Sequence, residues 1–257
     1  MKSRSAAVAG LFYPEDPTEL THSVKQMLAA QPLSQIERIQ ALVVPHAGYR
    51  YSGQIAAAAY KQLTKGQFKR VLLLGPNHRI PLRGIAAPSV DAFQSPVGAL
   101  PLDTLAIKQA TQQASVSYLD KAHQSEHCLE VQLPFVLLTL GQVTLIPLIV
   151  GNTPAIQVCE LIQSLMTPET LLLISTDLSH FHPLSQANQI DQQTLDQIMA
   201  LHPTLTGEQA CGAFPLNGAL MWAKQQGLTA TLLAKGNSVD GGGDADSVVG
   251  YASIALH

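Results

Sequence analysis

Histidines follow three apolar stretches of the chain, each a few residues beyond the last apolar position. The stretches and the polar segments after them are ALVV then PHAGY with His46, VLLL then GPNH with His78, and LLLI then STDLSH with Asp177 and His180. Imidazole nitrogens and carboxylates bind metal ions, and imidazoles transfer protons near neutral pH. The pattern therefore indicates three polar loops at the ends of three buried strands.

Two further segments contain side chains that could join such a site. HQSEHCLEVQLP, residues 123–134, contributes His123, Glu126, His127 and Glu130, and GEQACGAFPLNGAL, residues 207–220, contributes Cys211. Cys211 lies just before a predicted helix, and the positive end of a helix dipole favours a thiolate. We expect His127 to face the site and Cys128 to point into the core, because neighbours on a helix project about 100° apart.

Each of these residues also has an ordinary structural interpretation. A single histidine after a strand is often a loop or core-edge residue. Asp177 could cap a turn, and Cys211 could be a small buried apolar residue. What favours a site is that several of them follow strand ends, because sites in open α/β sheets form outside the carboxyl ends of strands.

Short apolar runs alternate with helical patterns along the chain. The predicted strands are 39–46, 70–78, 143–151, 170–180, 229–238 and 247–256, and the predicted helices are 52–66, 102–114, 126–141, 154–166, 188–202 and 215–227. We expect Ser52 to cap the helix over 52–66 and Gly66 to end it. The alternation predicts an α/β fold with a mixed, mostly parallel sheet flanked by helices. No linker or repeat divides the chain, so one domain is predicted over residues 1–257.

Composition and charge narrow the function classes. Only 13% of the residues are charged, the net charge is -3, and no Lys/Arg run is long enough to follow phosphates, so nucleic acid is not an expected partner. No stretch of about 18 apolar residues occurs, so we expect no membrane span. Tyr13 and Pro14 interrupt the N-terminal apolar stretch before it reaches signal-peptide length. The three cysteines lack framework spacing, which indicates free thiols and a cytoplasmic setting.

The ordered set of short motifs resembles the Memo family (mediator of cell motility), also described as AmmeMemoRadiSam system protein B. The matching pieces are AGLFYP (9–14), VVPHAGYRYSG (43–53), LLGPNH (73–78), SPVGALPLD (95–103), EHCLEVQLPF (126–135), IPLIVG (146–151), STDLSHFHP (175–183), ACG (210–212) and NSVDGGGDADSVVGYAS (237–253). Any one piece is a weak signal, whereas the set in this order is specific.

The resemblance implies a fold like that of the class III extradiol dioxygenases, with a mononuclear metal site at strand ends. The side chains that it implies for the site are His46, His78 and Cys211 as metal ligands, Asp177, His180 and His127 as catalytic groups, and Glu126 as a lining residue. A cysteine stands where the dioxygenases have a carboxylate, and a thiolate admits copper(I) or zinc alongside iron. The implied cofactor is one metal ion, with iron(II) or copper favoured and zinc as an alternative.

Three functions are compatible with these residues. The first is metal-dependent redox or oxygen-related chemistry, in which His180, oriented by Asp177, moves protons. The second is a zinc-dependent hydrolase, and the third is a non-catalytic module that binds a peptide or protein in the same cleft. The expected ligand is an unspecified small molecule or peptide. Family association implies a radical-SAM protein and an AMMECR1-like protein as partners.

Overall fold

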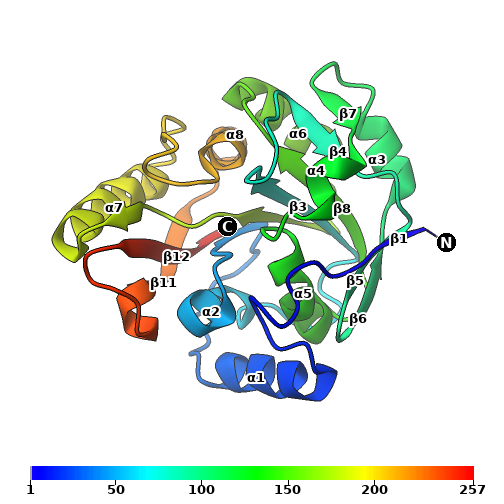
Figure 1. Ribbon diagram of the computed structural model, residues 1–257. Coiled ribbons are helices and arrows are strands. Elements are labelled where there is room, and N and C mark those ends of the chain that lie inside the picture. The colour runs from blue at the N-terminus through cyan, green and yellow to red at the C-terminus, as the bar shows by residue number, and fades with distance from the viewer. Residues whose placement is uncertain (1) are drawn as a thin grey trace.

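Within residues 2–257, which the computed structural model describes, the strands form two sheets (Figure 1). The large sheet has nine strands, and β11 (Ala230–Asn237) pairs only with β12. Its other strands run in the order β10 (His180–His182), β12 (Val248–Leu256), β2 (Ala41–Val44), β9 (Thr170–Ser175), β3 (Arg70–Pro76), β8 (Thr144–Val150), β4 (Ile85–Ala87) and β7 (Val116–Tyr118). The small sheet contains β1 (Ser3–Arg4), β5 (Ala92–Ser95) and β6 (Gly98–Pro101).

Parallel pairing is concentrated in the centre of the large sheet. The strands β2, β9, β3 and β8 are parallel neighbours, whereas β12 and β4 flank them in antiparallel pairing. This arrangement confirms the predicted α/β class with a mixed sheet. The three apolar runs that precede His46, Asp177 and His78 form β2, β9 and β3. Because these strands are parallel neighbours, their carboxyl ends lie side by side at one edge of the sheet.

Helices cover both faces of the large sheet. In Figure 1, α1 (Pro17–Ala29), α2 (Tyr49–Tyr60) and α5 (Leu133–Leu140) lie below the sheet. On the opposite face lie α3 (Thr104–Ala110), α6 (Ala155–Leu165) and α8 (Ala213–Gln225). The helix α7 (Leu184–Met199) packs against β10, β11 and β12. Three short helices, α4 (Asp120–Gln124), η1 (Glu130–Gln132) and η2 (Ser238–Gly241), lie in connections.

The hydrophobic core explains why the central strands are continuous apolar runs. All residues of β2 and β9 are buried, as are Val71 to Pro76 of β3. A parallel sheet covered by helices on both faces has no solvent-facing side, so polar and apolar residues do not alternate along its strands.

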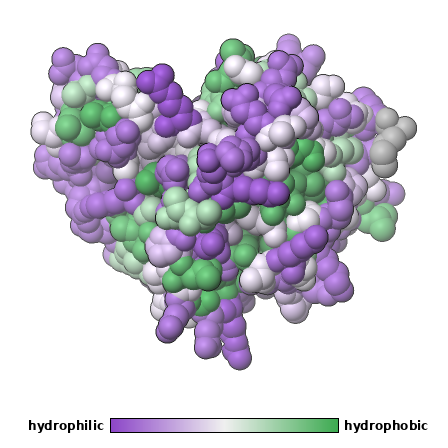
Figure 2. Space-filling view, turned by 90° about the horizontal axis from the view of Figure 1, so that it is seen from below, coloured by the Kyte–Doolittle hydropathy of each residue, from purple (hydrophilic) through white to green (hydrophobic). Residues whose placement is uncertain are grey.

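On the surface that Figure 2 shows, which is the underside of the molecule in Figure 1, polar side chains cover much of the area, with hydrophobic ones interspersed. Among residues 2–257, no helix combines the length and the apolar character needed to cross a membrane.

Two predicted helices differ from the structure in a way that matters for the site. The helix expected over 52–66 spans Tyr49–Tyr60, and Ser52 lies inside it rather than capping it. The helix begins early because the backbone N–H of Tyr49 is satisfied by the carbonyl of Phe12, at 2.7 Å. Gly66, which was expected to end this helix, lies beyond it with a φ of +80°.

The segment 126–141, predicted as one helix, is a turn followed by η1 and α5. The regular helix begins at Leu133, so Pro134 falls in its first turn. Proline is tolerated there because the first N–H groups of a helix have no partner inside it. The turn that precedes η1, and not a helix face, positions Glu126 and His127 next to His78, which follows β3.

Candidate metal centre

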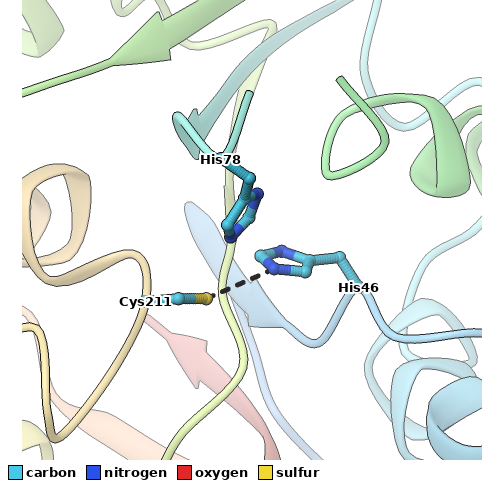
Figure 3. Close-up of side chains that lie close together, drawn as sticks. All are labelled: His46, His78 and Cys211. Atoms are coloured by element: carbon cyan, nitrogen blue, oxygen red, sulfur yellow. Dashed lines mark hydrogen bonds between the residues drawn. The ribbon is translucent and has the colours of Figure 1, made fainter. Parts of the chain in front are cut away.

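Three side chains from separate parts of the chain converge beyond the carboxyl ends of β2, β9 and β3. His46 follows β2, His78 follows β3, and Cys211 lies in the loop before α8. Their ligand atoms all lie within 4.8 Å of one another. His46 Nε2 is 3.2 Å from Cys211 Sγ, and the ring centroids of His46 and His78 are 5.2 Å apart. Figure 3 shows the two imidazoles and the thiol pointing toward one another.

The loop after β9 holds Cys211 in this position. The backbone N–H of Thr176 donates to the carbonyl of Val44 at 2.8 Å, so the loop continues alongside β2. Thr176 Oγ1 accepts the N–H of Gly212 at 2.8 Å, and the N–H of Asp177 donates to Cys211 Sγ at 3.3 Å. A Cβ at position 212 would lie 2.6 Å from Thr176 Cβ, so this close approach of the two loops requires glycine.

His46 is buried, and Asp177 holds its backbone. The N–H of His46 donates to Asp177 Oδ1 at 2.7 Å, and Asp177 Oδ2 lies 3.9 Å from His46 Nε2. Burial lowers the pKa of His46 well below its usual value, and positive charge on His78 and His127 would lower it further. Burial also raises the pKa of the Asp177 carboxyl. The His46 ring is therefore neutral near pH 7, which is the form that binds a metal.

Glu126 holds His78 by two hydrogen bonds. Its Oε2 accepts the backbone N–H of His78 at 2.7 Å, and its Oε1 lies 2.9 Å from His78 Nδ1. Burial alone would raise the pKa of the Glu126 carboxyl, but the His127 and His78 rings beside it hold that pKa well below its usual range. An ionised carboxylate can only accept a hydrogen bond, so His78 Nδ1 carries a hydrogen and its Nε2 is free to bind a metal.

A second group of candidate ligands shares His78 and consists of His78, Glu126 and His127. The Oε1 oxygen of Glu126 in this group already accepts several hydrogen bonds. Besides His78 Nδ1, Glu126 Oε1 accepts the backbone N–H groups of His127 at 2.9 Å and Cys128 at 3.1 Å. Three donors saturate one carboxylate oxygen, so a metal would have to displace them. Glu126 is therefore better suited to orienting His78 than to binding a metal itself.

His127 lies against the candidate ligands, and Cys128 points away from them. The His127 ring centroid is 5.4 Å from that of His46 and 4.8 Å from that of His78. Its Nδ1 lies 3.2 Å from Glu126 Oε1 but at an angle that makes no hydrogen bond. Cys128 is fully buried, and its thiol donates to the carbonyl of Pro76 at 3.1 Å. The expected directions are therefore observed, although a turn and not a helix produces them.

The thiol of Cys211 differs from the sequence-based expectation. Burial raises its pKa to about 12, and the nearby Asp177 carboxylate acts in the same direction. The thiolate expected from its position before α8 is therefore wrong for the metal-free chain. A helix terminus is typically worth about 1 kcal/mol or less at an ordinary position, which does not offset the cost of burying an unpaired thiolate.

His180 is held by a backbone carbonyl and not by Asp177. Its Nδ1 donates to the carbonyl of Leu178 at 2.9 Å, whereas the two oxygens of Asp177 face His46. The expectation that Asp177 orients His180 is therefore not met. Because a carbonyl can only accept, His180 Nδ1 carries a hydrogen, and in the neutral ring Nε2 has the lone pair.

Comparison with known proteins agrees with this architecture. Residues 4–255 match the family model described as Memo-like protein. The chain belongs to the Memo family. MEMO1 family proteins of Methanosarcina barkeri and Aquifex aeolicus are 33% and 32% identical to it, over 98% and 99% of this chain and 99% of each relative. The crystal structure of an uncharacterized protein from Escherichia coli K12 matches with a TM-score of 0.52 at 13% identity. It covers 86% of this chain and 100% of that chain, which shows a shared fold.

The donor set of this Memo family chain fits a metal ion. Three donors of two kinds, imidazole and thiol, surround one point, and no bulky side chain separates His46 Nε2 from Cys211 Sγ at 3.2 Å. Such a set suits zinc, copper or iron better than magnesium or calcium, which prefer oxygen ligands. The three side chains implied as ligands by the family resemblance are thus brought together, and their role as ligands is the proposal made below.

Two of the residues expected to add to the site lie behind it. Glu130 is fully buried and pairs with Arg4 at 2.8 Å, and His123 Nε2 donates to the carbonyl of Ala86 at 3.0 Å. Glu130 also accepts the hydroxyl of Tyr13 at 2.6 Å, so it ties the N-terminal segment to the wall of the site.

Four residues with structural roles around the ligands were not predicted from the sequence. They are Arg4, Gln132, Ser175 and Thr176, all of which are buried. For Gln132, Ser175 and Thr176 the available signal was that a polar residue occurs where a buried strand or helix was expected, since buried polar groups are retained only with partners. No such signal marked Arg4.

Proposed function

We propose that this chain binds one metal ion through His46, His78 and Cys211, with iron(II) or copper favoured, and uses it for redox or oxygen-related chemistry. The observation that carries the proposal is the convergence of three ligand atoms within 4.8 Å from three separate loops. Imidazole and thiolate together suit copper, zinc and iron, and the histidine pair is shared with the ligand sets of non-haem iron proteins.

The chain's own groups prepare the site for a cation. His46 is neutral because it is buried, and Glu126 holds His78 through Nδ1, so Nε2 is the ring nitrogen left for a metal. The thiol of Cys211 must release its proton when a metal binds. The side chain of His78 is 27% exposed and Cys211 is partly exposed, so a small molecule can reach the ligands from solvent. When bound, the metal would supply a redox centre or a Lewis acid.

His180 and His127 are the proposed catalytic groups, and Asp177, expected from the sequence to join them, is a proposed positioning residue. His180 is partly exposed, and its Nε2 is free to accept a proton because its Nδ1 is held by Leu178. His127 packs against both histidine ligands, where it can contact a substrate. Asp177 contacts His46 rather than His180, so its proposed role is to hold the ligand loop and to influence charge there. Removing a proton-transfer group typically costs ~100- to 10,000-fold in rate, so His180→Ala should keep the metal and lose turnover.

The proposal is tested by metal analysis and titration of the untagged protein. The chain is purified anaerobically without added metal, its metal content is measured, and the metal-free form is titrated with iron(II), copper(I) and zinc. Cys211→Ala removes one proposed ligand. Cys159→Ala is a matched control, because Cys159 is a buried cysteine of α6 outside the proposed ligand set. Circular dichroism follows folding in each case.

We expect the parent and Cys159→Ala to bind one metal per chain, and Cys211→Ala to bind each metal much more weakly while remaining folded. If Cys211→Ala binds all three metals as tightly as the parent, the ligand assignment is wrong. Oxygen uptake by the iron or copper form would support redox chemistry. Zinc binding with hydrolysis of ester or amide substrates would support a hydrolase instead, and a metal-free cleft that binds peptide would support a binding module.

A further inference from the structure

A buried chain of hydrogen bonds ends on the ring of His46. Ser175, the last residue of β9, lies at its centre and is fully buried. Its Oγ is 3.0 Å from His46 Nδ1, 2.9 Å from Gln132 Nε2 and 2.6 Å from the carbonyl oxygen of Cys128. Gln132 is buried as well, and its Oε1 accepts the hydroxyl of Tyr60 at 2.9 Å.

The direction of every bond in this chain follows from two backbone carbonyls, which can only accept. The carbonyl of Pro45 lies 2.9 Å from the Gln132 side chain and needs a donor, so the amide atom facing it is the nitrogen Nε2. The same nitrogen also donates to Ser175 Oγ. The carbonyl of Cys128 takes the single hydroxyl hydrogen of Ser175. A serine hydroxyl has one hydrogen and two lone pairs, so Ser175 has only an acceptor position left for His46. The hydrogen between them must therefore belong to His46 Nδ1.

We propose that Ser175, supported by Gln132, is a positioning residue that holds His46 in the tautomer whose Nε2 carries the lone pair directed at Cys211. This role of Ser175 rests on the proposed function, in which His46 binds the metal through Nε2, the nitrogen that lies 3.2 Å from Cys211 Sγ. The other tautomer would place a hydrogen at Nε2 and block that nitrogen as a ligand. Groups that orient ligand histidines in this way typically change metal affinity by ~10- to 100-fold when removed.

The proposal explains why a serine ends this strand. Ser175 pairs in register with Val44, two residues before His46, so β9 delivers the hydroxyl beside the imidazole on the neighbouring strand's loop. The site is buried on all sides of Ser175, and its partners are all polar atoms of the protein. Ser175→Ala therefore leaves His46 Nδ1 without its acceptor, and the bias toward one tautomer is lost.

The test measures the tautomer first, in the metal-free protein. With ¹⁵N-labelled histidine, the two ring nitrogens of His46 are assigned by long-range proton–nitrogen correlation, which distinguishes the protonated from the unprotonated nitrogen. The variants are Ser175→Ala and, as a milder change, Gln132→Met, which removes the amide behind the serine but keeps its hydroxyl. Ser253→Ala is the matched control, because Ser253 is also a fully buried strand serine that donates to a backbone carbonyl, that of Ile55. Each variant is then titrated with zinc and cobalt(II).

We expect the parent and Ser253→Ala to show His46 protonated at Nδ1 only. Ser175→Ala should show a mixture of tautomers and bind zinc roughly 10- to 100-fold more weakly, with Gln132→Met between the two. A parent protein with the hydrogen at Nε2 would overturn the inference, as would an unchanged tautomer and affinity in Ser175→Ala. If Ser175→Ala does not fold, an unchanged tautomer and affinity in Gln132→Met would overturn it. If the parent has the expected tautomer but binds no metal, the proposed function fails while the tautomer assignment stands.

Discussion

The carboxylate of Glu126 accepts both the backbone N–H and the ring Nδ1 of His78, at 2.7 Å and 2.9 Å. Glu126→Gln replaces one accepting oxygen by a donor, so one of these two bonds must be lost. We expect metal affinity to fall by roughly 10- to 100-fold, because the tautomer and orientation of His78 are no longer held. Zinc titration measures the change, and Glu160→Gln on the exposed side of α6 is the control. Equal affinities for Glu126→Gln and the parent would contradict an orienting role.

Cys211→Asp should change the preference among metals rather than abolish binding. The substitution creates a two-histidine, one-carboxylate set, which suits iron(II) better than copper(I). Competition titrations under anaerobic conditions should show the ratio of iron(II) to copper(I) affinity rising relative to the parent. A ratio that stays the same would mean that residue 211 is not a ligand.

Metal binding should release a proton from Cys211. The pKa of its thiol is about 12 in the metal-free chain, so the thiol is protonated at pH 7 to 9 and must ionise to bind. The apparent affinity should therefore rise by about tenfold for each pH unit in this range, since one proton is exchanged for one metal ion. Calorimetric titration in buffers of different ionisation enthalpy counts the protons. A count of zero would show that the thiol does not take part.

His123 should make the folded state less stable in mild acid. Burial lowers its pKa from 6.5 to about 4, so the folded chain does not bind a proton that the unfolded chain takes up below pH 6.5. Stability should be unaffected above pH 6.5, fall by about 3 kcal/mol as the pH drops to about 4, and then receive no further change from this residue. His123→Gln keeps a donor for the Ala86 carbonyl and cannot titrate. Urea denaturation between pH 8 and pH 4 should show a weaker pH dependence in this variant.

Glu130 should contribute strongly to stability through the N-terminal segment. Its carboxylate is fully buried against Arg4, and it also accepts the backbone N–H groups of Ala7 and Val8 at 2.8 Å and 2.9 Å. Breaking a buried pair by removing one charge typically costs about 3–5 kcal/mol, so Glu130→Gln should lower the free energy of unfolding by about this amount.

The control for Glu130 is an ion pair on the surface. In the Lys69–Glu169 pair the side chains are 75% and 59% exposed, so Glu169→Gln should change stability by about 1 kcal/mol or less. Denaturant titration compares the two variants. Similar losses in both would mean that the buried pair has no special importance.

Much of the fold followed from local patterns in the sequence. Apolar runs such as 71–74 and 171–174 predicted buried strands, and the helix predicted over 102–114 contains α3, which Asp103 caps. Strand and helix tendencies depend on residues a few positions apart, so they can be recognised without the rest of the chain. The helix predicted over 126–141 was right over Leu133–Leu140 and wrong before it, because its apolar spacing did not reveal the turn that Glu126 stabilises by accepting neighbouring N–H groups.

The sequence by itself determined the family, the α/β class and the residue types available for a site, because these depend on composition, order and local periodicity. Only the tertiary structure decided which of these residues meet. Pairing of β9 between β2 and β3 brings His46 to Cys211, which is 165 positions away in the chain. Burial then raises the pKa of Cys211, and hydrogen-bond direction sets the His46 tautomer. Both depend on atoms supplied by distant segments, so no local pattern in the sequence contains them.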